Sequence, residues 1–126
     1  MAHQTNKKIL IIDDEEGIRE SLKLILEDHY DLIVTDSGAQ AIDVLGNDKD
    51  HKVGLALLDI KMPKVNGLEV LKQIKALRPE LGVIMVTGYR SVDVAVESTR
   101  LGACGYIVKP FKSEEILGTV KRNMQN

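Results

Sequence analysis

Short apolar runs that alternate with longer segments of mixed polarity constrain the fold of this chain more than any other feature. Four of the runs lack the polar alternation of a half-exposed strand, so we interpret them as strands covered on both faces. They are residues 9–12, 55–58, 83–86 and 106–108. A weaker run at residues 32–34 is expected to form a fifth strand nearer a sheet edge.

The segments between these runs have the length and spacing of helices. The predicted helices cover residues 15–28, 37–47, 67–77, 91–101 and 113–124. One face of the first helix carries the apolar stripe of an amphipathic helix. The stripe consists of Ile18, Leu22, Ile25 and Leu26. Ser37 and Ser113 are predicted N-caps, and Glu115 adds negative charge in the first turn of its helix, where it suits the helix dipole.

One of these helices has an ambiguous pattern. Val92, Val94 and Val96 alternate with other residues as they would in a strand. The prediction of a helix over residues 91–101 therefore depends on the length of the segment and on the regular alternation of strand and helix.

The order of the elements predicts the fold class. Five alternations of strand and helix indicate an α/β fold, in which a five-stranded parallel sheet carries helices on both faces through right-handed crossovers. The flavodoxin-like strand order 2-1-3-4-5 is the simplest doubly wound arrangement of such units. The length fits a single domain over residues 1–126, with residues 7–124 ordered and both ends frayed.

Composition argues against several classes of protein. A formal net charge of −2 at pH 7 gives no long-range attraction for nucleic acid, so direct nucleic-acid binding is not expected. No apolar stretch approaches the about 20 residues of a membrane helix, and the polar N-terminus lacks the apolar core of a signal peptide. We therefore expect a cytoplasmic protein without membrane contact. The only cysteine, Cys104, excludes an internal disulfide and is interpreted as a small buried apolar residue.

Acidic residues that follow the predicted strands mark the candidate site, because ligands of open parallel sheets bind beyond the carboxyl ends of the strands. Asp13 and Asp14 follow the first strand, and Asp59 follows the third. These strands are neighbours in the order 2-1-3-4-5, so the three carboxylates are expected to converge. Such crowded carboxylates need a cation, and Mg²⁺ fits best. For residues 13–16 alone, a solvated helix start is an equally good interpretation.

Asp59 is the candidate nucleophile of this site. A bound cation would neutralise the phosphoryl oxygens that otherwise repel a carboxylate. Thr87 follows the fourth strand and offers a hydroxyl donor, and Lys109 follows the fifth and offers an ammonium. Each of these two residues alone is better explained as a turn hydroxyl or a surface lysine. It is the complete set at one sheet edge that predicts phosphoryl transfer.

Four segments of the chain resemble the signature segments of response-regulator receiver domains. They are residues 9–15, 57–63, 85–88 and 105–111, in the order and at the spacing of that family. The likeness covers nearly the whole chain, and the four segments together are far more specific than any one of them.

The resemblance implies a role for each matching residue. Asp59 is expected to be phosphorylated, with Thr87 and Lys109 in contact with the phosphoryl oxygens. Tyr106 corresponds to the switch aromatic of the family, which turns inward when Thr87 is drawn to the phosphate. Without the family it would be interpreted as a half-buried strand tyrosine. The implied Mg²⁺ site consists of Asp14 and Asp59 as direct ligands, Asp13 acting mainly through metal-bound water, and the backbone carbonyl of Lys61.

The resemblance also implies partners and a mode of action. A sensor histidine kinase or a phosphotransfer protein would donate the phosphoryl group, and the receiver would catalyse only its own phosphorylation and dephosphorylation. The change would reach the face formed by the fourth helix, the fifth strand and the fifth helix. That face would then control an output domain or partner protein and could support a phosphorylation-dependent homodimer.

Three other interpretations stay open from the sequence. A degenerate receiver would act only as a docking module, although all the phosphorylation residues are present. A haloacid-dehalogenase-type phosphatase needs a second Asp two residues after the nucleophile, where this chain has Lys61. A flavodoxin-like carrier of FMN needs a first loop that binds phosphate, whereas the acids at residues 13–16 would repel it.

Overall fold

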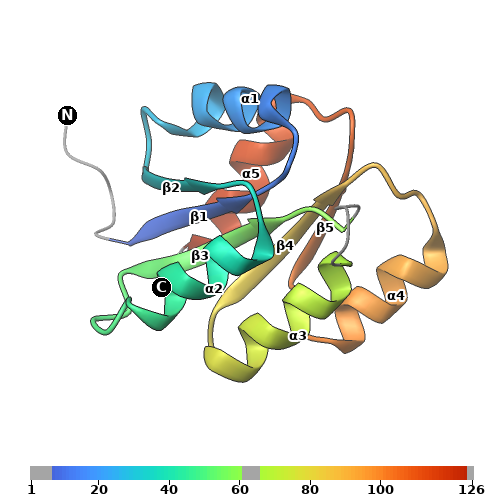
Figure 1. The fold of residues 1–126 in the computed structure, drawn as a ribbon. Helices are drawn as coiled ribbons and strands as arrows, with labels where there is room; N and C mark the ends of the chain where they lie inside the picture. Colours follow the sequence, from blue (N-terminus) through green and yellow to red (C-terminus); the bar gives the residue numbers. More distant parts are fainter. Residues whose placement is uncertain (1–6, 61–65, 125–126) are drawn as a thin grey trace.

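The structure, a computed structural model, describes residues 7–60 and 66–124, within which strands and helices alternate (Figure 1). The strands are β1 (Lys8–Ile12), β2 (Asp31–Thr35), β3 (Val53–Leu58), β4 (Gly82–Thr87) and β5 (Gly105–Val108). The helices are α1 (Glu16–Leu26), α2 (Gly38–Gly46), α3 (Gly67–Leu77), α4 (Val92–Arg100) and α5 (Ser113–Met124). No helix in this part of the chain is long and apolar enough to cross a membrane.

The strands form one parallel sheet in the order β2-β1-β3-β4-β5, which confirms the predicted fold class. The register aligns the carboxyl ends of neighbouring strands. Ile12 of β1 lies opposite Thr35 of β2 and Leu58 of β3. Leu58 in turn lies opposite Met85 of β4. Residues that follow these strands therefore lie close together, at the carboxyl ends of the strands.

Helices cover both faces of the sheet, with α1 and α5 on one face and α2, α3 and α4 on the other (Figure 1). Alternate residues of the central strands point to opposite faces. In β1, Leu10 and Ile12 pack on the side of α2 and α3. Ile9 and Ile11 pack on the side of α1 and α5. All four residues are 0% exposed, which explains why this run shows no polar alternation.

The two edge strands are less buried than the central ones. Thr35 is the only buried residue of β2, which confirms the expectation that residues 32–34 lie nearer a sheet edge. In β5 only Ile107 is buried, so the prediction that residues 106–108 are covered on both faces is wrong. As the last strand in the order, β5 has a neighbour on one side only.

The segment with the ambiguous valine pattern is a helix, α4. Ser91 is its N-cap, and the Ser91 hydroxyl accepts the N–H of Val94. Ser98 is the only buried residue of α4, whereas Val92 and Val96 are exposed. The exposure of these two valines explains why the valine pattern of the sequence does not mark the buried face of the helix.

One of the two predicted serine caps is confirmed. The Ser37 hydroxyl caps α2 by accepting the N–H of Gln40. Ser113 is instead the first residue of α5, so the prediction that it caps the helix is wrong by one position. The Lys112 carbonyl accepts the N–H of Glu115, and the Glu115 side chain accepts the N–H of Lys112. These two reciprocal hydrogen bonds cap the start of α5 in place of a serine side chain.

Cys104 is exposed, so its interpretation as a buried apolar residue is wrong. It lies between α4 and β5, where its N–H donates to the Val83 carbonyl at 2.8 Å. Cys104 directly precedes β5, the edge strand that has a neighbour on one side only.

Candidate functional site

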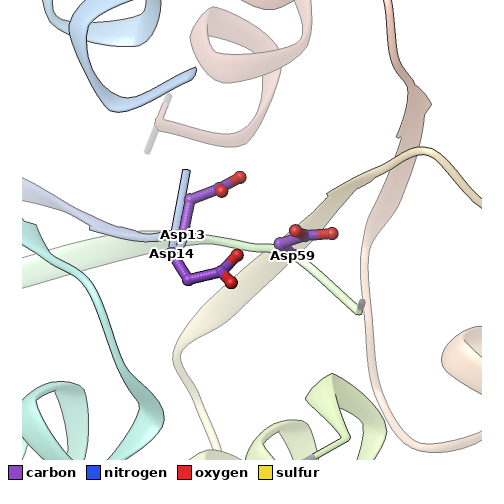
Figure 2. A group of neighbouring side chains, drawn as sticks. All are labelled: Asp13, Asp14 and Asp59. Atoms are coloured by element: carbon purple, nitrogen blue, oxygen red, sulfur yellow. The ribbon is translucent and has the colours of Figure 1, made fainter. Parts of the chain in front are cut away.

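Three aspartates gather at the carboxyl ends of β1 and β3 (Figure 2). Asp13 and Asp14 follow β1, and Asp59 follows β3. One carboxylate oxygen from each lies within 4.8 Å of the other two. Asp13 and Asp59 are each 2% exposed, whereas Asp14 is exposed. The cluster therefore has two buried members and one that is open to solvent.

Main-chain hydrogen bonds fix the position of the two buried aspartates. The Asp13 N–H donates to the Thr35 carbonyl at 3.2 Å, and the Asp59 N–H donates to the Ile12 carbonyl at 3.1 Å. These bonds continue the pairing of β1 with β2 and with β3 by one residue. The register of the sheet therefore sets the separation of the carboxylates.

Lys109 places an ammonium group among these carboxylates. Its Nζ lies 3.0 Å from Asp13 Oδ2, 2.8 Å from Glu15 Oε1 and 3.2 Å from Asp59 Oδ2. The Lys109 side chain is 12% exposed. The peptide bond between Lys109 and Pro110 is cis. The residue that follows β5 thus contacts groups that follow β1 and β3.

Burial and charge shift the pKa of two groups in the site. Burial raises the pKa of Asp13, an effect that the Glu15 N–H and the Lys109 ammonium oppose but do not cancel. Burial alone would lower the pKa of Lys109, but its hydrogen bonds with Glu15 and Asp13 raise it above the usual value. Lys109 is therefore a cation at neutral pH.

The donor set fits a hard divalent cation. Asp13, Asp14 and Asp59 offer carboxylate oxygens at close range, and burial of two of them favours a partner charge. A single ammonium compensates only part of the negative charge at this sheet edge. The predicted further ligand, the carbonyl of Lys61, lies outside the described residues.

Thr87 and Tyr106 both contact the connection between β4 and α4. Thr87 is 0% exposed, and its Oγ1 accepts the N–H of Tyr89 at 3.3 Å. The Thr87 carbonyl accepts the N–H of Lys109 at 2.8 Å. Tyr106 is half-buried, and its hydroxyl donates to the Tyr89 carbonyl at 2.9 Å. Burial raises the pKa of Tyr106, and the charge of Asp59 adds to this shift.

Three supporting residues were not assigned to the site from the sequence. Glu15 holds the ammonium described above. Arg19 of α1 donates to the Asp13 carbonyl at 2.9 Å. Gly67 begins α3, and a Cβ at this position would overlap the Asp59 carbonyl oxygen. The acidic run containing Glu15 is visible in the sequence, but only the fold shows which of its members turns toward the ammonium.

Comparisons with known proteins agree with this geometry. The family model of the response regulator receiver domain matches residues 9–121. Sporulation initiation phosphotransferase F of Bacillus subtilis is 37% identical over 118 residues, which cover 93% of each chain. A receiver domain protein from Methanospirillum hungatei has a crystal structure with a TM-score of 0.87 and 36% identity, covering 95% of this chain and 94% of that one.

Other relatives are longer than this chain. The transcriptional regulatory protein FixJ of Azorhizobium caulinodans is 34% identical, and the match covers 90% of this chain but 53% of FixJ. Response regulator protein FleR of Pseudomonas aeruginosa is 36% identical, and the match covers 92% of this chain but 24% of FleR. Because the family model spans most of the sequence, the chain belongs to the response regulator receiver domains of two-component systems.

Proposed function

We propose that the protein is a signalling switch that accepts a phosphoryl group on Asp59. The observation that carries this proposal is the environment of the Asp59 carboxylate. It is buried at the end of β3, lies 3.2 Å from Lys109 Nζ, and shares a cluster with Asp13 and Asp14. A nucleophilic carboxylate needs such neighbours, because it must approach a phosphoryl group that is itself negatively charged.

Mg²⁺ is the proposed cofactor of this reaction. Asp13, Asp14 and Asp59 would hold it, with the Lys61 carbonyl as the further ligand expected from the family. The bound ion would neutralise charge on the phosphoryl oxygens, and phosphoryl transfer depends on such electrostatic stabilisation together with positioning of the reactants.

The proposed transfer is an in-line displacement at phosphorus. An Asp59 oxygen forms the new P–O bond while the donor's bond to phosphorus breaks, and the electron pair leaves with the imidazole of a phosphohistidine or the carboxylate of an acyl phosphate. The Lys109 ammonium then pairs with a phosphoryl oxygen, and the Thr87 hydroxyl donates a hydrogen bond to the phosphoryl group. The reaction is the protein's own modification rather than turnover of a separate substrate.

The proposed output is a population shift toward an active conformer. Thr87 and Tyr106 both contact the main chain of Tyr89, so a change at Thr87 can alter the loop that leads into α4. The face formed by α4, β5 and α5 would then engage an output domain, a partner protein or a second copy. We place the whole chain, residues 1–126, in one cytoplasmic receiver domain whose donor is a sensor histidine kinase or phosphotransfer protein.

Phosphorylation with a small donor tests the proposal. Wild type, Asp59→Asn and Asp36→Asn are incubated with Mg²⁺ and acetyl phosphate, and the intact mass is measured. Asp36 is an exposed acid after β2 at the same sheet edge, so its substitution is a matched control. We expect one added phosphoryl group in wild type and Asp36→Asn and none in Asp59→Asn. Labelling of Asp59→Asn at the wild-type level contradicts the assignment, and an unlabelled wild type favours a docking module.

A further inference from the structure

Two kinds of carboxylate hold the Lys109 ammonium. Asp13 and Asp59 are buried and belong to the proposed cation site. The Glu15 side chain is 60% exposed, yet it makes the shortest of the three contacts at 2.8 Å. Glu15 is therefore a partner of Lys109 that the proposed chemistry does not use.

The main chain and the side chain of Glu15 make separate contacts. Its main-chain N–H donates to Asp13 Oδ1 at 2.9 Å, so the backbone orients a proposed cation ligand. Its side chain reaches Lys109, 94 residues further along the chain. A substitution of the side chain can therefore remove the contact with the ammonium while the backbone contact with Asp13 stays.

The ammonium of a lysine has three N–H donors, and three carboxylates surround it here. An arriving phosphoryl oxygen must take one of these donors. Release of Glu15 costs least, because its carboxylate is already exposed and regains water. We propose that Glu15 is a positioning residue that holds Lys109 in the unphosphorylated protein and competes with the phosphoryl group for its ammonium. The inference deepens the proposed function and rests on it.

The competition predicts a faster reaction when Glu15 loses its charge. An exposed ion pair contributes little, so the expected gain in the rate of phosphorylation by acetyl phosphate is about two- to fivefold. A negative charge near the entrance would also repel an anionic donor without any contact to Lys109. Glu16 separates the two effects, because it is an exposed acid in the first turn of α1, next to Glu15.

The test compares wild type, Glu15→Gln and Glu16→Gln at saturating Mg²⁺ over a range of acetyl phosphate concentrations. We expect the faster rate in Glu15→Gln alone. A second measurement needs no phosphorylation: lysine-selective ¹⁵N NMR of the metal-free protein, with the Lys109 signal identified by its loss in Lys109→Arg. That ammonium signal is expected to shift in Glu15→Gln and to stay in place in Glu16→Gln. Urea unfolding of each variant verifies that all remain folded.

The outcomes separate this inference from the proposed function. Equal rates in wild type and Glu15→Gln, or equal gains in both Gln variants, overturn the competition while leaving Asp59 as the acceptor. An unshifted Lys109 signal in Glu15→Gln overturns the positioning role. A wild type that gains no phosphate overturns the proposed function and the competition together, but the NMR result still decides whether Glu15 holds Lys109.

Discussion

Gly67 shows how closely the main chain is packed around the site. It is the first residue of α3, after the N-cap Asn66, and its N–H donates to the Ile60 carbonyl at 2.8 Å. A Cβ at Gly67 would overlap the Asp59 carbonyl and the Ile60 Cα. Both neighbours are main chain, which cannot rotate away as a side chain can. The start of α3 is therefore able to lie against the proposed acceptor only because this residue is glycine.

We expect Gly67→Ala to destabilise the protein by about 1–3 kcal/mol, because the added methyl group forces the main chain apart. Urea unfolding measures the loss. Gly17→Ala is the matched control, because an added Cβ in α1 meets nothing within 4 Å and alanine favours a helix. Its stability is expected to stay equal or to rise. Equal stabilities of the two variants contradict the close packing at Gly67.

At the same scale, the sequence predicts the residues of the site better than their contacts. Asp13, Asp59 and Lys109 are identified by their places directly after strands, since strand order alone brings those places to one edge. The contact of Glu15 with Lys109 joins residues 94 positions apart and depends on the path of the β5–α5 connection. No local pattern encodes that path.

At the scale of elements, Arg78 links the end of α3 to the start of β3. This contact lies at the amino ends of the strands, opposite the aspartate cluster. Arg78 is 5% exposed. Its guanidinium donates to Asp48 Oδ2 and to the Val53 carbonyl, each at 3.1 Å. Asp48 also accepts the N–H groups of Lys52 and Val53 at 2.9 Å. Burial would raise the pKa of Asp48, but these N–H groups and Arg78 outweigh it and hold that pKa below its usual value.

This network predicts a loss of stability in acid. A carboxyl whose pKa is lower in the folded state stabilises the fold above its unfolded pKa of about 3.9, and the contribution is lost as the pH falls through the lowered value. We expect Asp48→Asn to lower the free energy of unfolding at pH 7 by about 1–3 kcal/mol and to flatten its decline below about pH 5. Asp50→Asn, at an exposed position nearby, serves as the control. Parallel pH profiles of wild type and Asp48→Asn contradict the role of the pair.

The elements themselves are predictable where burial leaves a simple pattern. β1 and β4 lie between two helix layers and appear in the sequence as unbroken apolar runs. β5 has a similar composition but lies at an edge, so composition overstates its burial. The exposed valines of α4 mislead about the type of element. Valine is typical of strands, but here it lies on the surface of a helix.

At the scale of the whole molecule, the sheet separates two kinds of polar group. At the amino ends of the strands, opposite charges pair in the Arg78 network and link α3 to β3. At the carboxyl ends, negative charge is in excess around Asp59. Like charges crowded at a buried site reduce stability unless something binds there. A cation at the proposed site would therefore link the free energy of folding to the affinity for that cation, through the same carboxylates.

Asp14→Asn tests this linkage, since Asp14 is the exposed member of the cluster. The substitution removes one of the mutually repelling charges, so we expect equal or higher stability without a divalent ion. With Mg²⁺ at about 100 times its dissociation constant, binding to the folded state stabilises wild type by about 2.7 kcal/mol. At the same concentration the gain is expected to fall well below that in Asp14→Asn, because a ligand is lost. Thermal unfolding with and without Mg²⁺, with NaCl matching the ionic strength, measures both effects. Asp36→Asn is expected to keep the full gain, and an equal gain in Asp14→Asn excludes Asp14 as a ligand.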